Sequence, residues 1–349
     1  MERRRLGRTD IDVSCLGLGT MMYGDQIGER DAFEQMDYAL DVGINLFDMA
    51  ELYTIPPKPE TAGECERIVG RWLTDRKRRG DVVVATKIAG RSDRLSWLRE
   101  DGRLTRIIKR DILEAVEGSL KRLNVETIDL YQIHWPDRLL PVFGGDLRGY
   151  NHYEEDYAPF EETLDIFQEL IREGKIRHLG LSNETSWGAM RFLQASASEG
   201  RPRMQSIQNI YNLVSRVFEY GLAEIAMNED MGLLAYSPLG QGALLGKYLD
   251  GKAPAGTRGA LFGRLGRYET PSANNAIIDY LKVAESFDVD PAHMALQFVT
   301  TRPWVTSNLF GASSMEQLKR NVASLEMGWT DEIEAAVNAV HARYPNPCP

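Results

Sequence analysis

The sequence predicts an α/β protein built as a closed (β/α)8 barrel, the TIM-barrel architecture. The 349-residue chain contains eight short apolar segments typical of buried strands, and helical periodicity follows each one. Strict alternation of this kind predicts right-handed crossovers and a parallel sheet. Eight such units in about 300 residues fit closure into a barrel. No Pro- or Ser-rich linker divides the chain, so we expect residues 1–349 to form one domain.

The expected elements follow one another along the chain. Polar residues around a turn at 2–12 predict a short N-terminal hairpin. Strands are expected at residues 13–18, 44–48, 82–86, 128–134, 178–182, 206–210, 233–237 and 307–311. Helices are expected at residues 30–42, 63–78, 110–123, 159–173, 186–198, 216–230, 273–287, 291–301, 315–325 and 330–343. An open doubly wound sheet would need a break in composition near the middle of the chain, and none is visible.

Two connections, residues 135–158 and 249–272, are long and follow strands, so we expect them at the C-terminal face of the barrel. Loops of that length in a compact domain are usually functional or mobile. A third segment, residues 55–59, holds three prolines and is therefore stiff. We expect the first and third segments to shape a substrate pocket. Tyr150 and Tyr153 would line that pocket or pack the loop that carries them.

Composition limits the functions that the chain can perform. Its formal net charge is −10, from 41 basic and 51 acidic residues, and no basic stripe is present, which argues against nucleic-acid binding. The three cysteines lack metal-type spacing, which favours a reduced, cytoplasmic setting. No signal peptide or membrane-spanning run is visible. Five singly scattered histidines give little support to a metal-dependent hydrolase, and no metal site is predicted. The oligomeric state is left open.

Four residues with catalytic potential follow successive strands. Asp48 ends the second strand, Lys87 the third and His134 the fourth, while Tyr53 lies just beyond the second. Taken singly they fit a turn residue, a solvated lysine, a core histidine and a packing tyrosine. Strand ends of a parallel barrel converge on one face. Their ordered appearance on neighbouring strands therefore favours a common site.

These four side chains would form a coherent catalytic group. A buried Lys87 ammonium close to Asp48 would stay charged, because the pair offsets part of the desolvation cost. That charge near Tyr53 would lower the phenol pKa from its usual value of about 10. Tyr53 could then give a proton to a developing alkoxide, while a neutral His134 hydrogen-bonds the same oxygen. The arrangement suits reduction of a carbonyl group by hydride from a cofactor.

Over nearly its whole length the chain resembles the aldo-keto reductases. The resemblance is greatest to the branch that holds the potassium-channel β subunits and the bacterial Tas-like reductases. The segments that carry it are residues 17–21, 47–53, 85–87, 132–135, 180–183, 208–209, 235–239, 311–313, 317 and 321. In that family the four catalytic positions correspond to Asp48, Tyr53, Lys87 and His134. The resemblance implies that Tyr53 is the general acid for an aldehyde or ketone substrate, which Tyr53, His134 and Trp135 would contact.

The same resemblance implies an NADPH site. Ser182, Asn183 and Gln208 would hold the nicotinamide carboxamide, and Tyr236 would stack on the ring. The other expected cofactor residues are Gly19, Thr20, Met21, Asp48, Ser237, Pro238, Leu239, Gln241, Gly242, Leu244, Lys247, Arg258, Gly311, Ser313, Gln317 and Asn321. Arg264 and Arg267 lie close enough to Arg258 in sequence to compete for its role. Core packing for Tyr236, turns at Ser182 and Asn183, and a solvated helix face for Gln317 and Asn321 are the alternatives.

A second function remains open beside the reductase. A barrel that holds NADPH could act as a regulatory protein that senses redox state for a protein partner. The complete set of four catalytic residues favours the enzyme.

Overall fold

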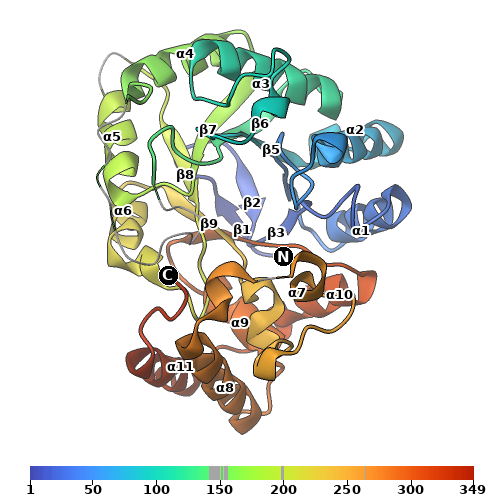
Figure 1. Ribbon diagram of the computed structural model, residues 1–349, viewed down its shortest axis with the longest axis vertical. Helices are drawn as coiled ribbons and strands as arrows, with labels where there is room; N and C mark the ends of the chain where they lie inside the picture. Colours follow the sequence, from blue (N-terminus) through green and yellow to red (C-terminus); the bar gives the residue numbers. More distant parts are fainter. Residues whose placement is uncertain (141–149, 151, 153–155, 198–199, 264) are drawn as a thin grey trace.

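A computed structural model describes residues 1–349 except 141–149, 151, 153–155, 198–199 and 264. Within these residues parallel strands close into an eight-stranded barrel, paired in the order β10-β3-β4-β5-β6-β7-β8-β9 (Figure 1). The predicted (β/α)8 fold is confirmed. The barrel strands are β3 (Leu16–Gly19), β4 (Leu46–Asp48), β5 (Val83–Ile88), β6 (Ile128–Ile133), β7 (Ile176–Ser182), β8 (Met204–Gln208), β9 (Gly232–Tyr236) and β10 (Val305–Phe310).

Apart from α7, which lies in the loop after β9, the α-helices surround this barrel and cover its outer face (Figure 1). In α3, apolar residues at helical spacing, among them Ile112, Val116 and Leu123, are buried. The helices are α1 (Glu29–Asp41), α2 (Glu64–Arg76), α3 (Lys109–Leu123), α4 (Phe160–Arg172), α5 (Ser186–Ala197), α6 (Leu222–Asn228), α7 (Arg258–Phe262), α8 (Pro271–Ser286), α9 (Pro291–Thr300), α10 (Met315–Ala323) and α11 (Asp331–Arg343).

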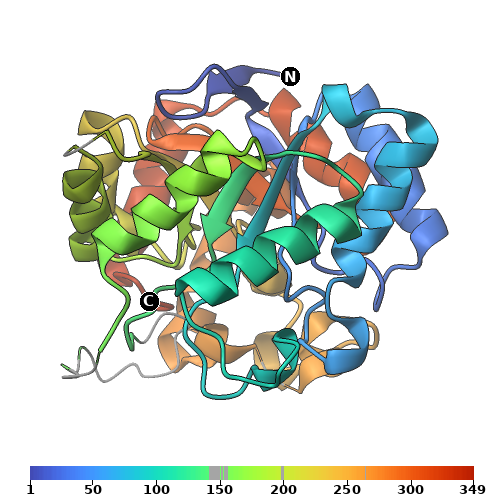
Figure 2. The ribbon, with the colours of Figure 1, turned by 90° about the horizontal axis from the view of Figure 1, so that it is seen from above.

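The hairpin of β1 (Arg3–Arg5) and β2 (Asp12–Ser14) closes one end of the barrel (Figure 2). Its apolar residues pack into the barrel interior: Leu6, Ile11 and Val13 share a buried cluster with Leu46, Val83, Ala85, Leu130, Leu234 and Leu309. The backbone N–H of Arg8 donates to Gln205 Oε1 at 2.9 Å, beside the start of β8. The hairpin therefore covers the amino ends of the strands, and the carboxyl ends stay available to ligands.

Several predicted boundaries differ from the structure. The strand expected at 13–18 is divided, because Asp12–Ser14 pairs with β1 in the hairpin and only Leu16–Gly19 joins the barrel. The strand expected at 206–210 is β8, which begins two residues earlier and ends at Gln208. The helix expected at 216–230 breaks at Gly221, whose extended φ of 160° separates a short 3-10 turn from α6. A Cβ at that glycine would lie 2.9 Å from Ser186 Oγ, so packing against α5 favours the break. The loop at 249–272 is also partly regular, because it contains α7.

The last helix is held by an ion pair whose strength depends on pH. Glu334 of α11 pairs with Arg302, accepts a hydrogen bond from Trp329 Nε1 at 2.7 Å and another from Asn338 Nδ2 at 2.9 Å. The hydrogen bond from Arg302, together with those from Trp329 and Asn338, lowers the pKa of Glu334 from 4.5 to about 2.

Stability contributed by Glu334 should therefore be complete above pH 4.5 and lost as pH falls toward 2. Because the carboxylate is partly exposed, we expect this contribution to be only about 1–2 kcal/mol. Urea unfolding of the wild type and Glu334→Gln between pH 6 and pH 3 measures it. The difference in stability between the two proteins should shrink as pH falls from 4.5 to 3, and a constant difference would contradict the assignment.

Candidate active site

The four predicted catalytic residues meet at the carboxyl ends of β4, β5 and β6. Lys87 is 0% exposed, and its Nζ donates to Asp48 Oδ2 at 2.5 Å and to the Met49 carbonyl at 2.7 Å. The same Nζ lies 3.5 Å from the Tyr53 hydroxyl. The Tyr53 and His134 rings meet edge to face, with centroids 5.5 Å apart. The structure thus brings all four side chains into one cluster.

Two glutamine amides complete the surroundings of Asp48. Gln132 Nε2 and Gln208 Nε2 donate to Asp48 Oδ1 at 3.1 Å and 2.9 Å. Sequence reasoning assigned no role to Gln132, although it lies two residues before His134, and residues at that spacing share a face of a strand. Gln208 was expected only to bind a carboxamide. With Lys87, these contacts satisfy the buried carboxylate.

Protonation in the site differs from the expectation in one respect. Burial, assisted by the Asp48 carboxylate, raises the pKa of the Tyr53 phenol well above 10. The prediction that Lys87 lowers this pKa is therefore wrong for the protein without bound cofactor or substrate. Burial also lowers the pKa of Lys87, and Asp48 opposes that shift. Burial, followed by the charge of Lys87, lowers the pKa of His134 well below 6.5. Tyr53 is therefore a neutral phenol and His134 a neutral imidazole near pH 7.

The residues expected to hold a carboxamide lie beside this cluster. Asn183 Nδ2 donates to the His134 carbonyl at 2.9 Å, and the Tyr236 hydroxyl donates to Asn183 Oδ1 at 2.7 Å. Ser182 Oγ donates to the Gln208 carbonyl at 2.8 Å. Asn183 has a φ of 52°, a left-handed conformation that asparagine tolerates. The predicted polar group is thus assembled, from the ends of β7, β8 and β9.

The segment after β9 turns sharply at the same face. Ser237, Gln241 and Gly242 have φ values of 56°, 58° and 90°. Gly242 suits that conformation because it has no Cβ, and it also lets backbone approach a ligand closely. Pro238 and Leu244 are buried, while Leu239 and Lys247 are partly exposed. Asn212 Nδ2 supports the turn by donating to the Ser237 carbonyl at 2.9 Å.

Arg258 is an enclosed cation without a described carboxylate partner. Its guanidinium stacks on the Phe262 ring at 4.8 Å and lies 4.0 Å from Met21 Sδ. Burial lowers its pKa. Arg267 instead donates to the Pro349 carbonyl at 3.0 Å, and Arg264 lies outside the described residues. An enclosed guanidinium with no carboxylate beside it fits an anionic group such as a cofactor phosphate.

The remaining expected cofactor residues lie around β3 and α10. Thr20 is buried and donates to the Asp48 carbonyl at 2.8 Å, while Gly19 and Met21 are partly exposed. Beyond Gly311, Ser313 Oγ and its backbone N–H bond to Gln317 Oε1 at 3.0 and 3.1 Å. Asn321 is only 4% exposed, so it does not share the solvated face of Gln317.

A cavity of about 260 Å³ lies beside Ser313, and it contains two carboxylates that sequence reasoning did not associate with a site. Asp31 and Glu34 come from α1, whereas the serines come from the turn before α10. No local sequence signal links these segments, which are far apart in the chain. On one side of the cavity, the start of α10 would attract an anion. On the other side, the carboxylates of Asp31 and Glu34 would repel an anion.

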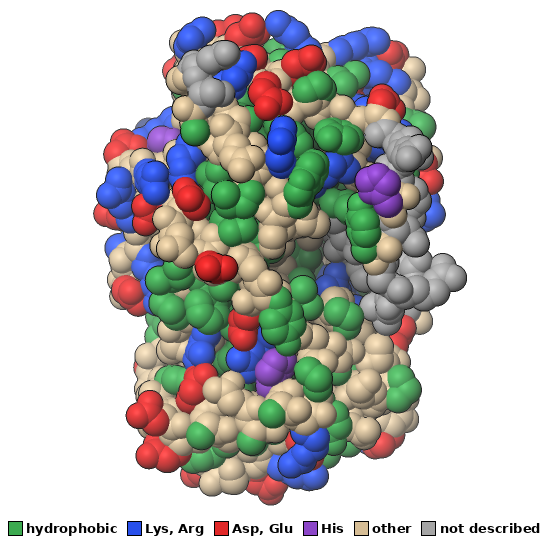
Figure 3. All heavy atoms as spheres, turned by 90° about the vertical axis from the view of Figure 1, so that its left-hand side faces the viewer, with side chains coloured by type: hydrophobic (Ala, Val, Ile, Leu, Met, Phe, Trp, Pro, Cys, Tyr) green, Lys and Arg blue, Asp and Glu red, His purple; other side chains and the backbone are tan. Residues whose placement is uncertain are grey.

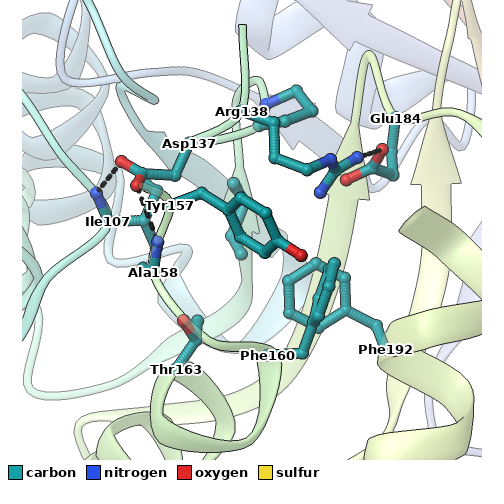
Figure 4. A pocket seen from close by; sticks show the side chains of 11 residues that line it. Ile107, Asp137, Arg138, Tyr157, Ala158, Phe160, Thr163, Glu184 and Phe192 are labelled. Atoms are coloured by element: carbon teal, nitrogen blue, oxygen red, sulfur yellow. Dashed lines mark hydrogen bonds and ion pairs between the residues drawn. The ribbon is translucent and has the colours of Figure 1, made fainter. Parts of the chain in front are cut away.

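The start of the 135–158 loop is tied by hydrogen bonds to the end of the same loop and to the segment before α3 (Figure 4). Asp137 accepts hydrogen bonds from the backbone N–H groups of Ile107 and Ala158, each at 2.9 Å. Arg138 Nη2 pairs with Glu184 at 2.5 Å. Of the predicted pocket residues in this loop, Tyr150 is 69% exposed and bonds to His152, and Tyr153 lies outside the described residues.

Trp135, which was expected to contact substrate, is 8% exposed, with its ring centroid 5.0 Å from that of His134.

The Pro-rich segment at residues 55–59 is held by a hydrogen bond from Gln26 Nε2, which donates to the Ile55 carbonyl at 2.9 Å. Lys58 also pairs with Asp25 at 3.1 Å. These contacts fix the backbone just beyond Tyr53.

The outer surface carries mixed charge. The face shown in Figure 3 has basic and acidic side chains interspersed with hydrophobic ones. Within the described residues, no group of three or more His, Cys, Asp or Glu is arranged to hold a metal ion. In the same part of the chain, no helix combines the length and hydrophobicity needed to cross a bilayer.

Comparison with known proteins gives consistent results. Residues 15–342 match the model described as the Aldo/keto reductase family. The chain is 44% identical to Protein tas of Escherichia coli, with all of both chains covered. It is 32% identical to the uncharacterized oxidoreductase YrpG of Bacillus subtilis, covering 99% of this chain and 97% of the relative. It is also 29% identical to a probable voltage-gated potassium channel subunit beta of Oryza sativa, covering 97% of each.

Proposed function

Because the chain belongs to the aldo/keto reductase family, whose members are nicotinamide-dependent oxidoreductases, we propose that it reduces an aldehyde or ketone with NADPH. The observation that carries the proposal is the contact of Lys87 with both Asp48 and Tyr53 beside a neutral His134. These groups supply a proton donor, a charge that stabilises its conjugate base and a hydrogen-bond donor for the carbonyl oxygen.

Tyr53 is proposed as the general acid. Its raised pKa keeps the phenol protonated, as a proton donor requires. When its proton moves to the substrate oxygen, the Lys87 ammonium 3.5 Å away stabilises the phenolate left behind. Asp48 holds Lys87 in place, and neutral His134 orients the carbonyl. When bound, NADPH supplies the hydride.

Residues from β7 to α10 are proposed to hold the cofactor. Ser182, Asn183 and Gln208 offer both donors and acceptors to a carboxamide, and the Tyr236 ring offers a stacking surface. The turn at residues 237–244, with Lys247 and Arg258, would face the pyrophosphate. Ser313 and Gln317 would face the adenosine end, whereas buried Asn321 would act only through packing. Asp31 and Glu34 oppose a 2′-phosphate there, so NADH is the competitor against which NADPH must be tested.

The reaction itself is the primary test. NADPH absorbance is followed with a panel of aliphatic and aromatic aldehydes and ketones, and NADH is run in parallel. We expect turnover with at least one carbonyl class and a higher kcat/KM with NADPH. Tight NADPH binding without turnover of any panel member would refute the enzyme. That outcome would favour the alternative function, an NADPH-binding regulatory protein. The Oryza sativa relative, whose name describes a channel subunit, motivates that alternative.

Arg258 gives a separate prediction about cofactor binding. Arg258→Gln should weaken NADPH binding about 10–100-fold, because a hydrogen bond to a charged group is worth about 1.5–3 kcal/mol and each 1.4 kcal/mol is tenfold. Fluorescence titration measures Kd. Lys252→Gln is the matched control, since Lys252 lies in the same loop with its side chain 68% exposed. Equal Kd values for the two variants would contradict the role of Arg258.

A further inference from the structure

The segment between β5 and α3, residues 89–108, carries none of the residues proposed for the reaction. It leaves the carboxyl end of β5, the strand that carries Lys87, and contains a short 3-10 turn at Ser96–Leu98. Its ends are drawn together, because Thr105 Oγ1 donates to the Gly90 carbonyl at 2.6 Å. Figure 2 shows the segment before α3 at the end of the barrel opposite the hairpin. It therefore lies at the face that carries the proposed reaction.

A buried ion pair fastens this segment to the Tyr53 loop. Arg99 Nη1 and Nη2 donate to Glu51 Oε2 and Oε1 at 2.9 and 3.0 Å. The two side chains are 0% and 3% exposed. Glu51 also accepts a hydrogen bond from the Ala89 backbone N–H at 2.8 Å, and Arg99 Nε lies 3.4 Å from Asp111 Oδ2. A two-point contact of this kind fixes orientation as well as distance.

The neighbours of this pair in the sequence, Leu52 and Leu98, belong to an apolar cluster. Buried Leu52, Ala89 and Trp135 form a small cluster, against which partly exposed Leu95, Trp97 and Leu98 pack. Leu52 directly precedes Tyr53, and Trp135 directly follows His134. Trp135 Nε1 also donates to the Arg91 carbonyl at 2.7 Å, which joins the cluster to the start of the segment.

We propose that residues 95–98 form the wall against which the apolar substituent of the carbonyl substrate packs. The Glu51–Arg99 pair is the positioning contact that holds this wall beside Tyr53. A flat aromatic or branched apolar substituent would bury surface against Trp97 and Leu98, whereas a short chain would not reach them. The protein is thus selective for carbonyls with bulky apolar groups. This inference rests on the proposed carbonyl reduction and adds its substrate class.

The test compares one aromatic and one short aldehyde, 4-nitrobenzaldehyde and propanal, with NADPH. Trp97→Ala should lower kcat/KM for the aromatic aldehyde about 10–100-fold, mainly through KM, because an apolar pocket contact is worth about 1–3 kcal/mol. The value for propanal should change less than about twofold. Leu104→Ala is the matched control, because Leu104 is 47% exposed in the same segment and outside the cluster. It should change neither substrate.

The positioning role of Arg99 has its own variant. Arg99→Lys keeps a positive charge beside Glu51 but loses the two-point contact, so it should lower the aromatic-to-propanal ratio in the same direction as Trp97→Ala. Thermal unfolding with NADPH bound separates this effect from misfolding. Equal loss for both aldehydes in Trp97→Ala, or no loss for either, would overturn the inference. If the wild type reduces no carbonyl at all, the proposed function itself fails.

Discussion

Tyr53→Phe is expected to lower kcat by about 10²–10⁴-fold, the contribution typical of general acid catalysis. The variant loses the hydroxyl that lies 3.5 Å from Lys87 Nζ but keeps the ring that meets His134 edge to face. Because Tyr53 is not among the residues proposed to contact NADPH, the Kd for the cofactor should change little. Steady-state kinetics and fluorescence titration on the same preparation measure the two quantities.

A phenol at the surface provides the control for this loss. Tyr220 is 68% exposed and lies outside the proposed site, so Tyr220→Phe should keep wild-type kcat. Wild-type activity in Tyr53→Phe would remove Tyr53 from the role of acid. A parallel loss of NADPH affinity would instead show that the tyrosine supports cofactor binding.

Lys87→Met is expected to reduce both activity and stability. It removes the cation that stabilises the Tyr53 phenolate. Among the described residues, it leaves the buried Asp48 carboxylate with hydrogen bonds from the amides of Gln132 and Gln208 alone. Breaking one side of a buried ion pair typically costs about 3–5 kcal/mol. We therefore expect that loss in the free energy of unfolding by urea, together with a fall in kcat of about 10²-fold or more.

A double variant separates the two consequences. Asp48→Asn/Lys87→Met contains no unpaired charge, and the asparagine oxygen can still accept from Gln132 or Gln208. The double variant should recover much of the stability that Lys87→Met loses, because contacting residues couple in double-mutant cycles. Its activity should stay low, because the cation near Tyr53 is still missing. Additive losses of stability would show that the two side chains do not act as a pair.

Much of the fold and part of the site follow from periodicity in the sequence. Apolar runs alternating with helical patterns predict the barrel, because each element must bury an apolar face against its neighbours. Asp48 and Lys87 could be predicted to meet for a similar reason. Asp48 pairs with Ala85 in the β4–β5 register, and Lys87, two residues further along β5, points to the same face. Residues at the ends of paired parallel strands lie close together because of the strand pairing itself, independently of contacts made by the rest of the chain.

Only the tertiary structure decides properties that depend on distant segments. The raised pKa of Tyr53 comes from burial by several elements, and a sequence motif shows the neighbouring charge but not that burial. Glu51 and Arg99 pair across 48 residues, and the cavity beside Ser313 brings in Asp31 and Glu34 from the other end of the chain. Local patterns encode the period of an element and the face it buries. The contacts between elements, and with them desolvation and charge pairing, are determined only when the barrel closes.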